Sequence, residues 1–380
     1  MHFRHERVDS NPPSGRLGSC STSDLTGNGL PDVIIGGLGD PVNISFMGRS
    51  VALRTRMGIG SLIKWLETNL FWYENPGWKR HDMSDSPPLD VSATLGDVTD
   101  NRRQDFISGQ GLDHQDLYWF EQPEDPRQSW TRRLITDAFE KYHDVAFGDV
   151  DNDGKPEVVG LSQESEVIFY YKIPDNPLGS PWPESGRHII AEEIDVEGVK
   201  IVDIDGDGEQ ELLAGPNVFT QPDDPAEPWE RECIAPGWEW TRIAVADVDE
   251  DGALEVVLAE GDRPYADGQP GRVAWFDPPD WTPHPLDTDL FCPHSLQVTD
   301  FTGSGTMDIY VAEMGLGINK DPEHFVFRNL GGGEFERELI FSGIPTHEAK
   351  AVDLTNNGRP DLVGKSYTPD HHVDIWYNER

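Results

Sequence analysis

Apolar stretches enter and leave an aspartate-rich turn seven times along the chain. The turns share the approximate pattern D-x-[DT]-x-[DN]-G-x-x-[DE] and begin at Asp24, Asp97, Asp149, Asp203, Asp247, Asp300 and Asp353. Short apolar runs bounded by turn residues are typical of strands. Successive turns begin 44 to 73 residues apart, which is the spacing of four-stranded propeller blades rather than of a helical solenoid. The pattern therefore predicts an all-β fold, a seven-bladed β-propeller.

Each repeat is predicted to supply four strands, called A to D from the axis outward. In the third repeat, residues 145–149 precede the turn as strand A and residues 157–162 follow it as strand B. An aromatic strand C and then a strand D come next. The seventh repeat ends after its strand C, whereas Phe3–Val8 has the strand D pattern. We therefore predict that the N-terminal strand completes the last blade and closes the ring, and that residues 1–380 form one domain.

The first blade carries an insertion over about residues 38–69, between its strands B and C. Residues 41–66 contain no acidic residue but include the basic residues Arg49, Arg54, Arg56 and Lys64. We expect a basic, apolar flap over the channel mouth, whose arginines bind a carboxylate or sulfate in bidentate fashion. The alternative is an oligomer contact, or a loop that packs against acidic neighbours.

Three of the seven turns carry a full set of carboxylates. A D-x-D-x-D-G turn places three carboxylates and a backbone carbonyl around one point, which suits a hard cation with six to eight oxygen ligands. In the other turns, threonine, asparagine or serine replaces carboxylates, and side-chain-to-backbone hydrogen bonds are expected to hold the turn. We predict about three structural Ca²⁺ sites, with an empty turn as the alternative. The predicted ligands are Asp149, Asp151, Asp153 and Glu157, then Asp203, Asp205, Asp207 and Glu211, then Asp247, Asp249, Asp251 and Glu255.

The composition is strongly acidic, with 70 Asp and Glu against 30 Lys and Arg and a formal net charge of −40. This charge argues against nucleic acid or an anionic membrane as a partner. Only 9 of the basic residues are lysines, and few lysines with many acids indicate adaptation to concentrated salt. The N-terminus lacks an apolar signal segment. We expect a cytoplasmic protein of a salt-adapted organism, or a secreted one whose signal has been removed.

Histidines recur at one position of the repeat, six residues before the first turn aspartate. His143, His294 and His347 share this position, so we expect them on one ring at the channel mouth, on the face opposite the aspartate-rich turns. Neutral imidazole can act as a general base or bind a transition metal, and a histidine at a strand end can also be structural. The same face is predicted to receive residues from the B–C loops and the ends of strands B: His114, Tyr265, His324, Tyr367, His371, His372, Gln110, Glu260, Glu313 and Lys365.

The aspartate-rich turns, repeated between apolar runs, resemble the FG-GAP/VCBS repeat family over the whole chain. This family forms seven-bladed propellers in integrin α-subunit heads, in several polysaccharide lyases and in sugar dehydratases such as aldos-2-ulose dehydratase-like enzymes. The resemblance implies the propeller fold and its calcium loops. Binding modules and enzymes both use the repeat, so it implies no single activity.

By analogy with the lyases of this family, we expect a polysaccharide lyase that eliminates across the C4–C5 bond of a uronic acid unit in an acidic oligo- or polysaccharide. His143 or His347 would be the base, and Tyr367 or another histidine, His294 or His114, the acid. Arg49, Arg54, Arg56 or Lys365 would neutralise the carboxylate, with His371, Glu260 and Glu313 as further substrate contacts. A divalent metal at the axial histidines is an alternative to these cations. The competing hypotheses are a non-catalytic glycan- or protein-binding propeller and a sugar dehydratase.

Overall fold

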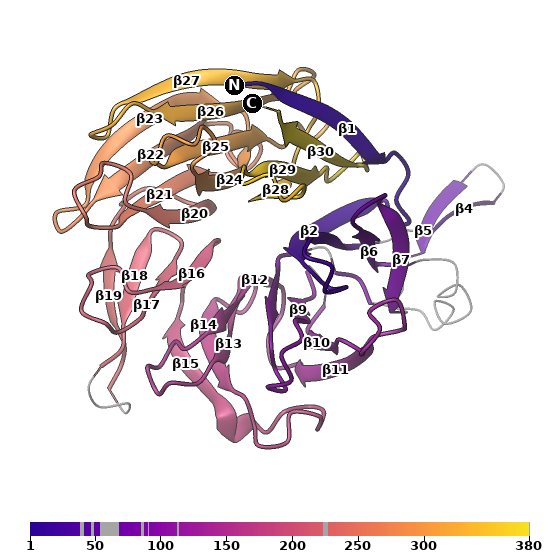
Figure 1. Ribbon diagram of the computed structural model, residues 1–380. Coiled ribbons are helices and arrows are strands. Elements are labelled where there is room, and N and C mark those ends of the chain that lie inside the picture. Colours follow the sequence, from indigo (N-terminus) through magenta and orange to yellow (C-terminus); the bar gives the residue numbers. More distant parts are fainter. Residues whose placement is uncertain are drawn as a thin grey trace.

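The computed structural model describes residues 1–38, 42–46, 49–53, 68–84, 87–89, 91–111, 114–222 and 227–379. Seven four-stranded antiparallel sheets lie in a ring around a central axis (Figure 1). Apart from a single 3₁₀ turn at Glu184–Gly186 (η2), no helix occurs in this part of the chain. The predicted seven-bladed β-propeller is therefore confirmed.

The first four blades follow the predicted order of strands from the axis outward. Blade 1 contains β2 (Arg16–Ser23), β3 (Asp32–Leu38), β6 (Leu70–Glu74) and β7 (Lys79–Ser84). Blade 2 contains β8 (Ala93–Gly96), β9 (Asp105–Gly109), β10 (Leu117–Glu121) and β11 (Thr131–Thr136). Blade 3 contains β12 (Tyr142–Gly148), β13 (Glu157–Ser162), β14 (Val167–Lys172) and β15 (Arg187–Glu192). Blade 4 contains β16 (Val199–Val202), β17 (Glu211–Ala214), β18 (Asn217–Thr220) and β19 (Glu230–Cys233).

The last three blades have the same order, except that the seventh takes its outer strand from the N-terminus. Blade 5 contains β20 (Thr241–Ala246), β21 (Glu255–Glu260), β22 (Gly271–Asp277) and β23 (Thr282–Leu290). Blade 6 contains β24 (Pro293–Thr299), β25 (Asp308–Glu313), β26 (Glu323–Asn329) and β27 (Phe335–Ser342). Blade 7 contains β28 (Glu348–Val352), β29 (Asp361–Lys365), β30 (Val373–Asn378) and β1 (Phe3–Asp9).

The two ends of the chain close the ring, as predicted from the missing outer strand. Strand β1 pairs with β30, from Phe3 opposite Asn378 to Arg7 opposite Asp374, and the termini lie side by side in Figure 1. Asp374 on β30 is only 1% exposed, and it binds His5 Nε2 at 2.6 Å and Arg7 Nε at 2.9 Å. A buried carboxylate thus holds the N-terminal strand by charge as well as by backbone hydrogen bonds.

The insertion in blade 1 includes a hairpin, β4 (Val42–Phe46) and β5 (Arg49–Leu53), which pair only with each other. In Figure 1 the hairpin projects from the outer side of the ring, away from its centre. This part of the insertion therefore does not cover the channel mouth, contrary to the prediction, because its strands satisfy their hydrogen bonds within the hairpin. The predicted substrate residue Arg49 begins β5, whereas Arg54 and Arg56 fall outside the described residues.

The core lies between neighbouring blades and is built mainly from the aromatic third strands. Trp72, Trp119 and Trp376 are fully buried there. Planar side chains of the outer strands stack on these aromatics. His284 lies 3.7 Å from Trp275 between ring centroids, and Arg337 lies 3.8 Å above the Phe325 ring. These outer-strand residues stabilise individual blades and take no part in the axial cavity.

All seven aspartate-rich loops share one hydrogen bond, in which the ninth-position acid accepts the backbone N–H of the second residue. In four blades an amide side chain at the end of strand C also donates to the second-position carbonyl of the preceding blade's loop. The four contacts are Asn75 to Leu354, Gln122 to Leu25, Asn329 to Val248 and Asn378 to Phe301. The amides therefore link these blades to the loops of their neighbours.

Candidate functional site

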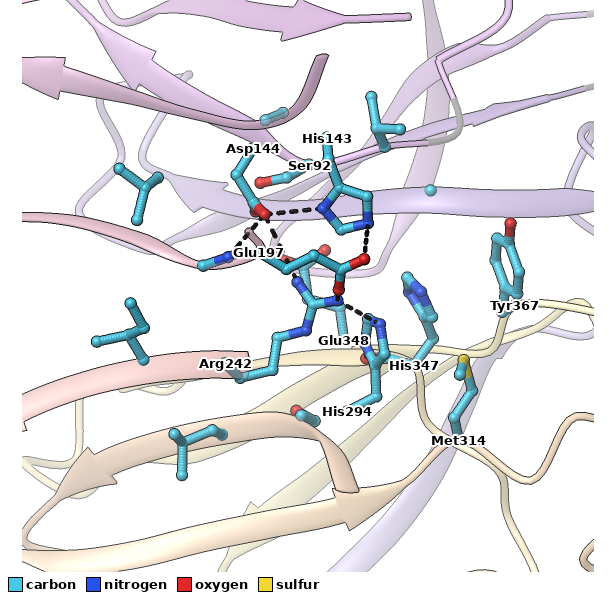
Figure 2. Close-up of a pocket in the computed structure, with 18 of the residues that line it drawn as sticks. Ser92, His143, Asp144, Glu197, Arg242, His294, Met314, His347, Glu348 and Tyr367 are labelled. Atoms are coloured by element: carbon cyan, nitrogen blue, oxygen red, sulfur yellow. Dashed lines mark hydrogen bonds and ion pairs between the residues drawn. The ribbon is translucent and has the colours of Figure 1, made fainter. Parts of the chain in front are cut away.

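A cavity of about 1040 Å³ opens at the end of the channel opposite the aspartate-rich loops. The starts of the innermost strands and the loops between the second and third strands line it. His143, His294 and His347 all contribute to its wall, as their shared register predicts, together with Tyr265 and Tyr367. Figure 2 shows how the three histidines and their charged neighbours meet in this cavity.

Two carboxylates occupy both ring nitrogens of His143. Its Nδ1 lies 2.8 Å from Asp144 Oδ2, and its Nε2 lies 3.2 Å from Glu197 Oε1 (Figure 2). Burial opposes the charged form, but the Glu197 and Asp144 carboxylates raise the pKa of His143. An imidazolium held between two carboxylates cannot accept a substrate proton in this arrangement, so His143 does not fit the predicted role of base.

His294 is held as a neutral ring by one donor and one acceptor. Arg242 Nη2 lies 2.6 Å from its Nε2, and a guanidinium can only donate. The other nitrogen, Nδ1, therefore carries the proton and donates it to the backbone oxygen of His347 at 2.8 Å. Burial, followed by the charge of Arg242, keeps the pKa of His294 well below its ordinary value. Its ring nitrogens are also both occupied.

His347 differs from the other two because its Nε2 has no hydrogen-bond partner among the described residues. Its ring is stacked between His294 and Tyr367, with centroid distances of 3.9 and 4.5 Å. On the side of Nδ1 it contacts Lys365 Nζ. Lys365 Nζ also donates to the backbone oxygen of Leu17, at 2.7 Å, and to that of Gly18. Contacts on three sides thus fix the orientation of the His347 ring, and its Nε2 remains available to a ligand in the cavity.

Lys365 is fully buried behind His347 and is absent from the cavity lining. Burial lowers the pKa of Lys365 to about 7. The carboxylate of Glu348 opposes this change, whereas the charges of Arg242 and Lys350 add to it. The prediction that Lys365 binds substrate directly is therefore wrong. Its three acceptors enclose the ammonium group, so Lys365 acts on the cavity only through His347.

Seven other residues predicted on this face lie outside the cavity lining: Gln110, His114, Glu260, Glu313, His324, His371 and His372. Glu260 is buried between Arg263 Nη1 at 2.8 Å and Arg272 Nη2 at 2.6 Å. Glu313 accepts backbone N–H groups of Phe291 and Glu323. The ends of the second strands point into loops rather than toward the axis, so these acids stabilise the loops. His114 and His371 contribute no part of the described cavity wall.

The register argument missed charged residues at two neighbouring positions of the innermost strands. Five residues before the turn aspartate stand Asp144, Arg242 and Glu348, and three residues before it stand Lys200 and Lys350. All five line the cavity. The signal was present in the sequence, because charged residues inside otherwise apolar inner strands recur at the same register as the histidines do.

The cavity wall is cationic in a strongly anionic protein. Its basic residues are Arg16, Lys141, Lys200, Arg242 and Lys350, against the acids Asp144, Glu197, Asp262 and Glu348. Five cations and four carboxylates give a formal charge of +1 before any histidine is counted, whereas the whole chain carries −40. A focused positive region of this kind favours an anionic ligand.

The three acid-rich loops on the opposite face each bring carboxylates together. Four ligand oxygens, from Asp247, Asp249, Asp251 and Glu255, lie within 4.8 Å of one another. The other two loops gather three acids each: Asp149, Asp151 and Glu157, and Asp203, Asp205 and Glu211. The predicted ligands Asp153 and Asp207 stand outside these groups.

Lys172 contacts two acids of the third repeat's loop. Its ammonium group lies 2.6 Å from Asp151 and 2.7 Å from Asp153. A carboxylate oxygen of Asp151, Oδ1, and one of Glu255, Oε1, are nevertheless buried without a hydrogen-bond partner. Burial, and then the neighbouring carboxylates, raise the pKa of Glu157 to about 8 and that of Glu255 to about 7. These loops therefore fit a hard cation, and no comparable group includes the axial histidines among the described residues.

Comparison with known families identifies residues 97–160 as a match to the FG-GAP-like repeat. The matched segment runs from the second aspartate-rich turn into β13 and confirms the FG-GAP repeat part of the resemblance; a similarity to lyases or dehydratases is not shown. No curated protein sequence matches the chain.

The solved structures to which the chain is similar are distant in sequence. The V. cholerae biofilm matrix protein Bap1 is 12% identical, with a TM-score of 0.44, and the match covers 98% of this chain and 70% of that one. The Photorhabdus luminescens Tc holotoxin pore is 13% identical, with a TM-score of 0.35, over 82% of this chain and 16% of that one. Within the described residues, no helix has the length and apolar character needed to cross a membrane.

Proposed function

We propose that the axial cavity binds an acidic saccharide and catalyses β-elimination beside its carboxylate group. The observation that carries this proposal is His347, whose Nε2 is unoccupied among the described residues while its Nδ1 contacts a buried lysine. A carbon acid next to a carboxylate needs both a base and nearby positive charge, because the negative charge that develops must be stabilised. His347 would supply the base, and the cationic wall would supply the positive charge.

In the proposed reaction, Lys365 begins as a neutral amine and accepts a hydrogen bond from Nδ1–H of His347. His347 Nε2 takes the proton from C5 of the uronic acid unit, and its Nδ1 proton passes to Lys365 Nζ. The C4–O bond breaks while a double bond forms between C4 and C5. Tyr367, whose ring lies 4.5 Å from that of His347 between centroids, donates its hydroxyl proton to the leaving oxygen. Lys365 then returns a proton to Nδ1 of His347, and the Nε2 proton passes through water to the Tyr367 phenolate, which restores all three residues.

The cavity size favours a short saccharide or a chain end over the middle of a polymer. Pockets of roughly 300–1,000 Å³ enclose drug-sized ligands, and the cavity of about 1040 Å³ lies just above that range. The sugar dehydratase hypothesis requires the same base and the same short substrate, so it remains the nearest alternative. A non-catalytic glycan- or protein-binding propeller would use the cations but would have no need of the Lys365 contact with His347.

Ultraviolet spectroscopy tests the elimination directly, since an unsaturated uronate product absorbs in the near ultraviolet. Incubation with a panel of uronate-containing oligosaccharides should give this absorbance with the native protein. His347→Gln should lower kcat by about 10²–10⁴-fold, as expected when a general base is lost. His371→Gln is the matched control, because His371 lies outside the cavity lining, and it should keep full activity.

Two results would overturn the proposal. If no product forms although uronate oligosaccharides bind to the cavity, the protein is a binding module. If His347→Gln retains native kcat in a folded protein, another group is the base.

We also propose that the three acid-rich loops hold structural Ca²⁺. The proposal is supported by the compact acid groups and by the buried carboxylate oxygens without partners in two of them. Oxygen-only ligand sets of this kind suit calcium. The loops lie at the opposite end of the inner strands from the cavity, so the ions would stabilise the blades and take no part in the reaction.

A further inference from the structure

We propose that Lys200 and Lys350 form an anion subsite within the axial cavity that His347 also lines, and that it receives a carboxylate group of the ligand. The inference rests on the proposed function for the identity of the ligand, an acidic saccharide. It differs from the sequence-based prediction, which assigned carboxylate binding to the insertion of blade 1 and to Lys365.

The two lysines come from different blades but share one level of the channel. Lys200 stands on β16 and Lys350 on β28, each three residues before its turn aspartate, and both line the cavity. The neighbouring level, five residues before the aspartate, holds Asp144 and Glu348. Lys350 Nζ reaches Glu348 Oε1 at 2.7 Å, so this lysine points along the channel toward the level of the histidines.

The ammonium group of Lys200 occupies the same region. Burial in the channel, and then the charge of Lys350, lower the pKa of Lys200, while Asp144 and Glu348 oppose this change. Both lysines and His347 line the same cavity, so a carboxylate held by the lysines would lie in the cavity that also receives the reacting carbon.

The charges at this level are incompletely paired. Glu348 is already fully used, because its Oε1 binds Lys350 and its Oε2 accepts the backbone N–H of Cys20 at 2.8 Å. Lys200 has no hydrogen bond or ion pair to another residue of the described chain. Lys200 is exposed within the channel, so an anion can reach its ammonium group, and an anion between two ammonium groups relieves their mutual repulsion. A carboxylate between Lys200 and Lys350 would supply the missing charge.

The distribution of lysine in the chain supports a role for these residues. Only 9 of 380 residues are lysines. Three of them, Lys141, Lys200 and Lys350, line the cavity, and Lys365 lies buried behind it. Lysine is otherwise replaced by arginine over most of this protein. Its concentration around one cavity indicates that compact, flexible cations are needed there, as in recognition of a single carboxylate.

Isothermal titration calorimetry of the full chain with D-glucuronate and, as the neutral counterpart, D-glucose tests the subsite at fixed ionic strength. The native protein should bind glucuronate at least tenfold more tightly than glucose. Lys200→Gln should abolish most of this preference, and Lys200→Met, which keeps the aliphatic stem, should do the same. Lys155→Gln is the matched control, since Lys155 is an exposed lysine of an aspartate-rich loop, and it should bind like the native protein. Equal glucuronate affinity in native and Lys200 variants, both folded by circular dichroism, would overturn the subsite.

The same titration with His347→Gln separates the subsite from the proposed reaction. If this variant binds glucuronate through Lys200 and no elimination product forms with any protein, the subsite stands and the lyase function fails. If the native protein forms product but Lys200→Gln leaves KM for uronate substrates unchanged, the function stands and the subsite fails.

Discussion

At the residue scale, the buried contact between Lys365 and His347 sets the proton state of the site. When Lys365 is an ammonium group, its three protons satisfy Leu17, Gly18 and Nδ1 of His347, and His347 must then present Nε2–H. When Lys365 is neutral, Nδ1 donates instead and Nε2 becomes a base. The protonation of a lysine outside the cavity therefore decides whether the exposed nitrogen donates or accepts.

This coupling predicts how activity depends on pH. Because the pKa of Lys365 is lowered to about 7, the fraction with a basic Nε2, and with it kcat, should rise as the pH passes upward through about 7. Lys365→Met should remove the proton acceptor and lower kcat by about 10²–10⁴-fold. Measurement of kcat between pH 5 and 9, with Lys155→Met as control, checks this. A Lys365→Met enzyme with the native pH profile would contradict it, and ¹⁵N NMR of the His347 ring reports the proton position independently of activity.

At the element scale, two different kinds of contact hold the loops between the first and second strands of the blades. Loops with a ninth-position aspartate place it between two backbone N–H groups, as Asp308 does with Phe301 and Asn329. The three loops with a ninth-position glutamate lack the second of these bonds and instead gather carboxylates. In the four blades whose loop has a ninth-position aspartate, an amide side chain at the end of the third strand links the blade to its neighbour. A cation is proposed to stabilise the three loops with a ninth-position glutamate.

Removal of calcium should destabilise the acid-rich loops selectively. An ion that binds only the folded protein adds about 2.7 kcal/mol of stability at a free concentration 100 times its Kd, so chelation should lower Tm. Asp249→Ala should reduce this response, because Asp249 belongs to the most complete acid group. Thr355→Ala, at the same loop position in a loop without that group, should leave it unchanged. Scanning calorimetry at fixed ionic strength makes the comparison, and a Tm indifferent to chelator would refute the sites.

The amide links between blades predict a cost when one of them is removed. Asn329 Nδ2 donates to the backbone oxygens of Val248 at 2.7 Å and Met307 at 3.1 Å. Asn329→Ala should leave these carbonyls without a donor and lower the free energy of unfolding by about 1–3 kcal/mol. Denaturant unfolding measures the change, with exposed Asn176→Ala as control. A loss equal to that of the control would show that the link contributes no stability.

At the scale of the whole molecule, stability depends on closing the ring with the first strand. Strand β1 covers the outer edge of β30, and Asp374 joins it to His5 and Arg7. An uncovered strand exposes unpaired backbone groups and promotes association between molecules. The axial site also depends on closure, because Lys365 of blade 7 bonds to Leu17 and Gly18 of blade 1.

Deletion of residues 1–9 should therefore lower Tm and cause aggregation, detectable by light scattering during thermal unfolding. Asp374→Asn, which keeps the strand but weakens its charged anchor, should have an intermediate effect. A truncated protein that unfolds as cooperatively and at the same temperature as the full chain would contradict the closure.

Local patterns determined the number of blades, the closing strand and the ring of histidines, because strand periodicity and repeat register are properties of contiguous sequence. They also placed the acid-rich loops on the far face. Local sequence could not show which histidine is available. Asp144 is next to His143 in sequence, but the partners that complete both sites come from other blades: Glu197 binds His143, and Arg242 binds His294 at a separation of 52 residues.

Only the tertiary structure decided the role of Lys365, whose ammonium group meets the backbone of Leu17 across 348 residues of chain. Such contacts arise when the first and last blades are brought together, and no spacing rule anticipates them. The same reason applies to Glu260. Sequence register assigned Glu260 to the site, but in the structure Arg263 and Arg272 bind its carboxylate. Register along a strand placed residues at one level of the channel. Packing between blades decided which of them remain free to act.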